Sequence, residues 1–212
     1  MYILLALYLL ILISLNGYEI ITQYKKWKEI MIKYKKQIPL TLLYTFVLNP
    51  LSLFLTEKYV LSDLQFVYSL IFEILIFILS INIFDIYIGI THYIQHKYFY
   101  KYHKVHHQIR ETCITLTLYN NIIDQLIISV PYYFLPNILG FSKMSYYVFI
   151  SFTLLQSMIY HKIYDDKNKD FTYHNYHHYN QSKNYSSGFI GTFSIVDRIL
   201  GTYVDTKKIK NS

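Results

Sequence analysis

Long apolar runs dominate this chain of 212 residues and restrict the folds open to it. About 20 apolar residues in a helix suffice to cross the hydrocarbon core of a bilayer. The sequence has five runs at or near this length, at residues 2–18, 39–55, 66–90, 122–141 and 144–160. Inside lipid the backbone must bond within its own segment, which favours helices. The predicted fold is an all-α integral membrane bundle of about four to five transmembrane helices, in one domain of residues 1–212.

The composition agrees with a membrane protein and excludes several other classes. Hydrophobic residues make up 53% of the chain and charged residues only 16%, which is more apolar than a soluble domain of this size. The single Cys113 excludes an internal disulfide and any cysteine-based zinc or iron–sulfur cluster. The net charge is +7, but the lysines cluster beside the apolar runs. This placement suits lipid headgroups and membrane topology, and we expect no nucleic-acid partner.

The distribution of lysines predicts how the chain crosses the membrane. The first apolar run lacks a basic segment before it and a clear cleavage site after it, so we interpret it as a retained transmembrane helix. The lysine-rich residues 25–36 that follow should lie in the cytoplasm. Two helical hairpins then return the chain to the cytoplasm near His92 and near His161. We therefore expect a lumenal or extracytoplasmic N-terminus, a cytoplasmic C-terminus and a histidine-rich cytoplasmic cap of helices.

Histidines occur only after residue 91, beside the predicted membrane boundaries. They form an HxxxH pair, an HxxHH box, a lone histidine and a second HxxHH box: His92, His96, His103, His106, His107, His161, His174, His177 and His178. Helix positions i, i+3 and i+4 share one face, so each cluster can aim two or three imidazoles at one point. Nine imidazoles exceed the four to six ligands of one ion, which predicts two metal ions. A redox role would favour iron over zinc, because zinc has no second accessible oxidation state.

Two aspartates have the spacing of residues that support metal ligands. Asp85 lies almost two helical turns before His92, and Asp165 lies four residues after His161. A carboxylate in such a position could accept the second ring N–H of a ligand histidine and fix its orientation. For Asp85, a plain polar residue near a helix end is an equally good interpretation.

The motif text resembles the fatty acid hydroxylase/sterol desaturase superfamily of membrane enzymes over residues 80–205. All four histidine motifs occur in the order of that superfamily. The segments "FDIYIGITHYIQH", "YKYHKVHH", "IYHKIYDD", "HNYHHYNQSKNYSS" and "VDRILGTY" are most similar to C-4 methyl sterol oxidase and sterol C-5 desaturase. The chain departs from the usual pattern at Tyr93, where arginine is common, and at Val196, where tryptophan is common. Asn121-Ile122 stands where a His-Pro pair is common.

The resemblance implies a non-haem di-iron oxidoreductase of residues 81–205, preceded by membrane helices in residues 1–80. It implies that the nine histidines are the metal ligands and that Asp197, in the last motif, supports the site. The expected reaction is O2-dependent hydroxylation or desaturation of a sterol-like or fatty-acyl lipid, with two Fe, or zinc as a substitute.

The remaining expectations concern partners, location and the alternative functions. The chain has no dinucleotide fingerprint of its own, so electrons should come from a cytochrome b5-like carrier and its reductase. The expected location is a membrane of the endoplasmic-reticulum type. Two alternatives stay open: a sphingolipid or fatty acid hydroxylase, and a catalytically inactive metal-binding membrane protein.

Overall fold

The computed structural model describes residues 3–61, 64–65, 67–164, 172–186 and 194–206. All regular structure in these residues is helical, which confirms the predicted all-α class. The long segments are α1 (Ile3–Lys33), α2 (Ile38–Leu43) continued by η1 (Tyr44–Leu48) and α3 (Asn49–Tyr59), α4 (Leu70–Tyr98), α6 (Ile122–Leu139) and α7 (Lys143–Tyr160). The short ones are α5 (Tyr100–His103), η2 (His106–Gln108), η3 (Ile114–Leu116), α8 (Tyr173–Tyr179) and α9 (Ile195–Leu200).

Four helical segments are long and apolar enough to cross a membrane: Ile3–Lys33, Ile38–Tyr59, Leu70–Tyr98 and Ile122–Leu139. Large apolar side chains such as Leu10, Ile21 and Ile138 are exposed on them, as expected of a surface that faces lipid. α1 is kinked at Gln23, whose φ of −135° is not helical, and the part before the kink extends about 30 Å, which matches a hydrocarbon core. The part after the kink carries the lysine-rich segment. The chain is a membrane protein.

Local sequence signals set the ends of the helices around the core. Asn121 caps α6 by accepting a hydrogen bond from the amide of Ile123, and Ser142 caps α7 by accepting one from the amide of Ser145. Gly140 ends α6 in the left-handed conformation, with φ of 63°. The core between the helices mixes aliphatic and aromatic side chains and includes Phe84 and Phe149, whose rings pack edge to face.

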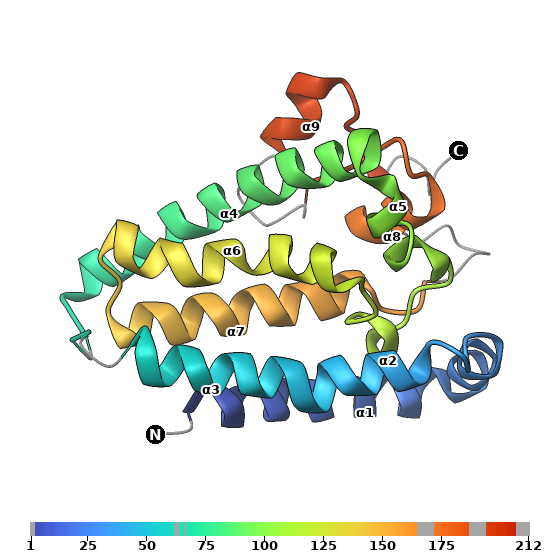
Figure 1. Ribbon diagram of the computed structural model, residues 1–212, viewed down its shortest axis with the longest axis horizontal. Coiled ribbons are helices and arrows are strands. Elements are labelled where there is room, and N and C mark those ends of the chain that lie inside the picture. The colour runs from blue at the N-terminus through green and yellow to red at the C-terminus, as the bar shows by residue number, and fades with distance from the viewer. Residues whose placement is uncertain (1–2, 62–63, 66, 165–171, 187–193, 207–212) are drawn as a thin grey trace.

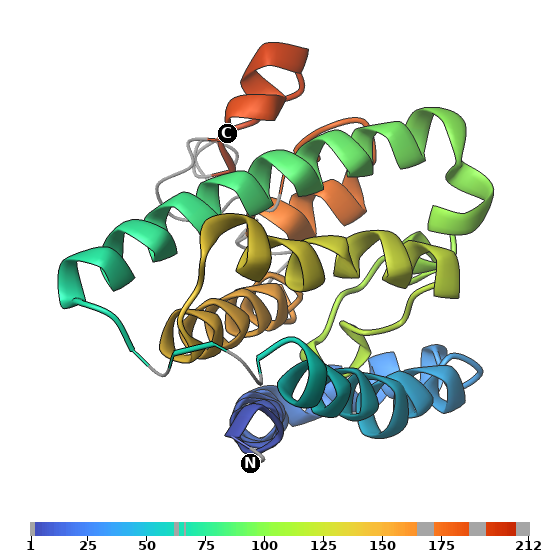
Figure 2. The same ribbon diagram turned by 60° about the vertical axis from the view of Figure 1, so that its left-hand side comes forward.

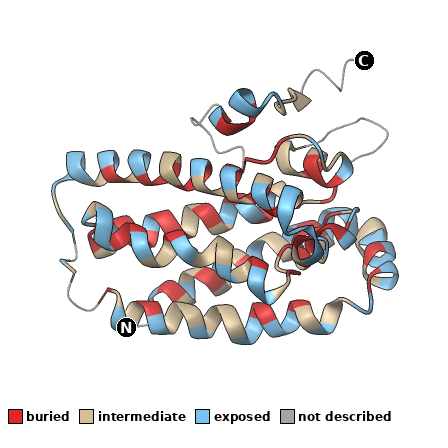
Figure 3. Cartoon of the chain, turned by 45° about the horizontal axis from the view of Figure 1, so that its top comes forward, coloured by how far each residue is buried: buried red, intermediate tan, exposed pale blue. Residues whose placement is uncertain are grey.

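The long segments run back and forth along one direction, so that the ends of α1, α4 and α7 meet the start of α2 and α6 (Figure 1). The short helices α5 and α8 and the loops around them gather at this same end (Figures 1 and 2). Exposed residues cover the outward faces of the helices and buried residues face inward (Figure 3). The hairpins therefore bring all histidine-bearing segments to one end of the bundle, as the topology predicted. Which side of the membrane this end faces stays a prediction.

Candidate metal centre

Five separate segments deliver the nine histidines to this end of the bundle. His92 and His96 lie in the last turns of α4, and His103 ends α5. His106 and His107 begin η2, His161 follows the last turn of α7, and the final three lie on α8. The first HxxHH box is not one helix, because Lys104 and Val105 form a turn between α5 and η2. The second box is helical throughout, as predicted.

The imidazoles form two adjacent groups, each with ligand atoms that all lie within 4.8 Å of one another. The first group is His92, His96, His103, His107 and His177; the second is His106, His161, His174 and His178. Both HxxHH boxes are divided between the groups, so sequence neighbours such as His177 and His178 serve different ones. This differs from the expectation that each cluster aims at one point. The division into five and four fits two ions better than one.

The spacing inside the first group suits ligands of a common ion. The Nε2 atom of His107 lies 3.0 Å from that of His96, 3.0 Å from that of His103 and 3.2 Å from that of His177. Two nitrogens bound to one ion at about 2.1 Å, a right angle apart, would be separated by about 3.0 Å. In the second group, the Nε2 atoms of His106 and His178 are 2.9 Å apart.

Hydrogen bonds outside the groups fix the orientation of six rings. Five rings donate their Nδ1–H to a backbone carbonyl: His92 to Tyr185, His106 to Tyr119, His161 to Ser157, His177 to Lys183 and His178 to Ile109. The sixth, His103, donates its Nδ1–H to the carboxylate of Asp124. In a neutral imidazole the Nε2 atom then carries a lone pair. The lone pairs of His106 and His178 thus face each other at 2.9 Å. That contact is repulsive by itself and becomes favourable around a cation, so the residues fit a bound metal.

Burial favours the neutral form of His106, His161 and His178, whose pKa values it lowers. Loss of hydration, with a smaller contribution from neighbouring His161, lowers the pKa of His106 to about 3. Loss of hydration also lowers the pKa of His161 to about 4. The pKa of His178 is well below its ordinary value for the same reason, reinforced by His106. Neutral imidazole is the form that binds metals, so no proton competes for these sites at physiological pH.

Asp124, in the first turn of α6, holds the first group in place. Its carboxylate is fully buried and accepts a 2.9 Å hydrogen bond from Nδ1 of His103. It also accepts a hydrogen bond from Nε2 of Gln95, at 2.5 Å. A carboxylate at the first turn of an apolar helix was the available signal, but it is also a common feature of helix N-termini.

The three aspartates predicted to support the ligands have different outcomes. Asp85 is buried, but His92 donates its Nδ1–H to the carbonyl of Tyr185 at 2.7 Å and not to Asp85. The helical stripe placed these residues on one side of α4, whereas the ring rotates toward a loop that the stripe could not reveal. Asp165 lies outside the described residues. Asp197 acts through the backbone, as described next.

Asp197 holds the loop that orients His92. Its carboxylate accepts hydrogen bonds at 2.7 Å from the amides of both Tyr185 and Ser186. It also accepts one from the hydroxyl of Tyr173 at 2.8 Å. Asn184, which adopts a positive φ of 56°, fixes the other side of the loop. These contacts connect the segment that follows the second HxxHH box to Asp197.

Glu19 on α1 is a second buried acid that the sequence did not single out. Its carboxylate accepts hydrogen bonds at 2.8 Å from the amides of Ile114 and Ile163. Ile114 follows the first HxxHH box, and Ile163 follows His161. Glu19 therefore ties two histidine-bearing segments to the first membrane helix.

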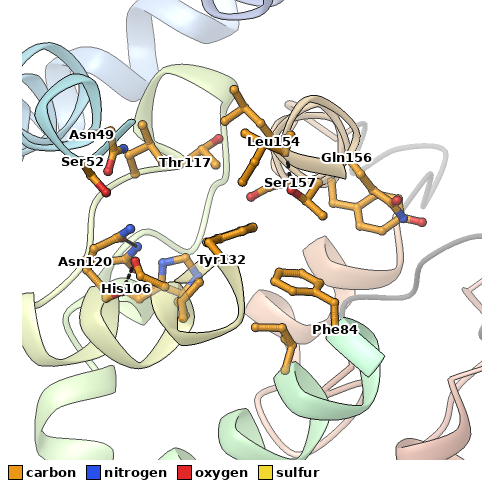
Figure 4. Close-up of a pocket in the computed structure, with 18 of the residues that line it drawn as sticks. Asn49, Ser52, Phe84, His106, Thr117, Asn120, Tyr132, Leu154, Gln156 and Ser157 are labelled. Carbon is orange, nitrogen blue, oxygen red and sulfur yellow. Dashed lines mark hydrogen bonds between the residues drawn. The ribbon is translucent and has the colours of Figure 1, made fainter. Parts of the chain in front are cut away.

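A cavity of about 220 Å³ lies between the helices and reaches both histidine groups, at His92 and His103 of the first and at His106 of the second. Figure 4 shows Asn49, Ser52, Asn120 and His106 on one side of this space and Phe84 across from them. The cavity can accept part of an apolar molecule that enters from the bilayer, with its reacting atoms beside the imidazoles.

Comparisons with known proteins give the family of the chain. No curated protein and no solved structure matches it. The family model described as fatty acid hydroxylase matches residues 75–202, which is more than half of the chain and contains all nine histidines. Members of this family are typically metal-dependent, in agreement with the two histidine groups. The chain belongs to the fatty acid hydroxylase family and is therefore a membrane-embedded oxidoreductase of the lipid-oxidising kind.

Proposed function

We propose that this protein catalyses the O2-dependent hydroxylation or desaturation of a sterol-like or fatty-acyl lipid at a centre of two iron ions. The observation that carries the proposal is the pair of buried imidazole groups with converging lone pairs, next to a cavity inside an apolar bundle. Five imidazoles would hold one ion and four the other. The motif text favours a sterol-like lipid, and a sphingolipid or fatty acid is the second candidate within the same family.

The residues of the chain supply placement, orientation and exclusion of water. When bound, a pair of iron ions supplies the dioxygen chemistry that an unactivated C–H bond requires. Asp124 and the carbonyls of Tyr185 and Lys183 keep the rings of their histidines in a fixed tautomer. The apolar wall around Phe84 and Ile150 keeps bulk water from the reacting carbon.

The electron donor and the orientation in the membrane belong to the proposal as well. We place the histidine end in the cytoplasm, in a membrane of the endoplasmic-reticulum type. Three exposed lysines adjoin the HxxxH pair and the first HxxHH box in the sequence: Lys97, Lys101 and Lys104. Such a basic surface suits docking of an acidic electron carrier, such as cytochrome b5 with its reductase.

Metal content and oxygen consumption test this function. Elemental analysis of detergent-purified protein should give close to two Fe per chain, or two Zn where expression has loaded the wrong metal. The iron-loaded protein should consume O2 when given a reductant and a lipid extract, and lipid profiling of an expressing host should reveal the product. A reproducible content of one ion or fewer would contradict the two-metal centre. Two ions without lipid-dependent O2 consumption would favour an inactive metal-binding protein.

A further inference from the structure

One loop of the cavity wall carries two buried polar side chains, each with an atom that lacks a hydrogen bond. The hydroxyl of Thr117 and the side-chain oxygen of Asn120 have no partner among the described residues. The side chains are only 3% and 5% exposed, and both line the cavity on the loop between η3 and α6. A buried polar group without a partner costs about 1–3 kcal/mol of stability. An unsatisfied polar atom in a cavity wall therefore suggests that a ligand supplies the missing hydrogen bond.

The hydrogen-bonding capacity left to these two side chains decides which kind of ligand atom they can bind. The amide nitrogen of Asn120 donates to Gln125 at 3.1 Å, so its oxygen is the atom left to accept a hydrogen bond. The hydroxyl of Thr117 can both donate and accept. A ligand hydroxyl, which also does both, can bond to either atom and supplies the donor that the Asn120 oxygen requires. An ester or ketone oxygen would leave Asn120 unsatisfied, because it can only accept.

The side chains of the cavity wall do not favour an acidic group at Asn120. Among the described residues that line the cavity, none is an aspartate, glutamate, lysine or arginine. An ionised carboxylate or phosphate at Asn120 would meet an oxygen that, like its own, only accepts hydrogen bonds, and no lysine or arginine of the cavity wall would offset its desolvation cost. The polar part of the ligand is therefore neutral.

The position of the two atoms relative to the histidines limits where the lipid reacts. The carbonyl of Tyr119, the residue before Asn120, accepts the Nδ1–H of His106 at 3.3 Å. His106 and Asn120 lie side by side at the cavity, with Thr117 on the same loop (Figure 4). A hydroxyl bound there holds the carbons next to it at the second histidine group.

We infer that Thr117 and Asn120 form a binding site for the hydroxyl of a neutral lipid and direct oxidation to carbons a few bonds from that hydroxyl. This inference rests on the proposed function for the reaction, but the binding site itself is independent of it. A sterol and a long-chain alcohol share the required chemistry. The test below separates these two sources.

Binding of matched lipid pairs to detergent-purified full-length protein tests the site. The probes are cholesterol against 5α-cholestane and 1-octadecanol against octadecane, with stearate as the acidic lipid. At least one alcohol should bind about tenfold more tightly than its counterpart without the hydroxyl, and stearate should bind no better than the hydrocarbon. Which pair shows the preference identifies a sterol or an acyl source. The absence of preference in both pairs would overturn the inference.

Substitutions at the two residues should weaken the binding of the alcohol. Thr117→Val and Asn120→Leu should reduce the preference for the alcohol about fivefold to tenfold and leave hydrocarbon binding within twofold. Without lipid, Thr117→Val should raise the melting temperature by a few degrees, because it removes an unsatisfied hydroxyl. Asn120→Leu also breaks the hydrogen bond to Gln125, so it should not raise the melting temperature. Thr117→Ser, which keeps the hydroxyl, should retain the preference even where the other variants fold poorly.

Thr153→Val is the matched control. Thr153 is as buried as Thr117 and lines the same cavity, but its hydroxyl already donates to the carbonyl of Ile150 at 3.0 Å. This variant should keep the alcohol preference and lose stability. If Thr117→Val and Asn120→Leu also keep the preference, the assignment is wrong, even when the protein contains two ions and oxidises lipid. If the preference disappears in these variants but no oxidation is found, the binding site stands and the proposed function fails.

Discussion

At the scale of single residues, adjacent histidines of one box serve different groups. On α8, His177 contacts His96 and His107 of the first group, whereas His178 contacts His106 of the second. Neighbours on a helix point about 100° apart, so a pair in sequence can bridge two sites that lie side by side. The HxxHH pattern is thus suited to holding two ions a short distance apart. A single site would need only the i, i+4 pair.

Replacement of His177 by alanine should abolish lipid oxidation. The ring is fully buried, and its Nε2 atom lies 3.1 Å and 3.2 Å from those of His96 and His107. Loss of a residue that only supports a ligand costs about 10- to 100-fold in affinity or activity, so loss of a ligand should cost more. Product levels and metal content at equal expression provide the measurement.

Tyr179→Phe is the control for this substitution. Tyr179 is two residues further along α8 and 68% exposed, so removal of its hydroxyl should leave activity within a factor of about two. Near-normal product from well-expressed His177→Ala would show that the histidine groups are not the catalytic centre.

Asp124→Asn should weaken the first histidine group and leave the fold intact. The amide has the size of the carboxylate but lacks its charge, so it accepts the Nδ1–H of His103 less strongly and can rotate to present a donor. We expect a loss of about 10- to 100-fold in metal affinity or activity. Metal titration of the apo protein measures it.

Glu73→Gln is the matched control for Asp124→Asn. Glu73 lies in the first turn of α4, at the opposite end of this helix from His92 and His96. It accepts hydrogen bonds from the amide of Tyr68 and the hydroxyl of Ser142. The Glu73→Gln substitution should lower the stability of the protein without changing its metal affinity. Equal metal affinities of Asp124→Asn and the wild type would exclude the role of Asp124.

At the scale of elements, α4 packs unusually closely against the C-terminal segment. A Cβ atom on Gly89 would lie 2.8 Å from the hydroxyl oxygen of Ser186 and 2.9 Å from Cβ of Val196. The glycine therefore permits the approach of the loop whose Tyr185 carbonyl orients His92. Asp197 holds this loop from the other side, so α9 completes the support of the first histidine group.

Gly89→Ala should separate α4 from this loop. Overpacking of this kind costs about 1–3 kcal/mol, and the displaced carbonyl would release the ring of His92. We expect a lower melting temperature together with reduced metal occupancy, measured by thermal unfolding and elemental analysis.

Gly17→Ala serves as the control within a long helix. Nothing lies within 4 Å of a Cβ at this position in α1, so the change should be neutral or stabilising by up to about 1 kcal/mol. An unchanged melting temperature and metal content in Gly89→Ala would contradict the close approach seen in the structure.

At the scale of the whole molecule, the apolar runs predicted the helices, and the hairpins between them predicted which helix ends meet. Both signals depend on the length and hydrophobicity of the segments, which can be read from each segment alone. The division of the histidines, the part played by Asp124 and the rotation of His92 toward Tyr185 could not be obtained in this way. They depend on which segments lie against each other, and side chains far apart in the sequence meet there. The cavity with its two unsatisfied atoms belongs to this second kind of information.

The arrangement of the bundle predicts which residues can be labelled from the same side of a membrane. The background for labelling is the protein with its buried Cys113 changed to Ala. Single cysteines that replace Lys28 and Lys104 lie at the histidine end, whereas a cysteine that replaces Lys58 lies at the far end of α3. In sealed vesicles an impermeant maleimide should label Lys28→Cys and Lys104→Cys from the cytoplasmic side, and Lys58→Cys only after the membrane is opened. Labelling of Lys28→Cys and Lys104→Cys from opposite sides would contradict the hairpin arrangement of α2–α3 and α4. Labelling of both from the lumenal side would keep the bundle and reverse its orientation, because the helices fix which ends meet and the lysines fix only which side they face.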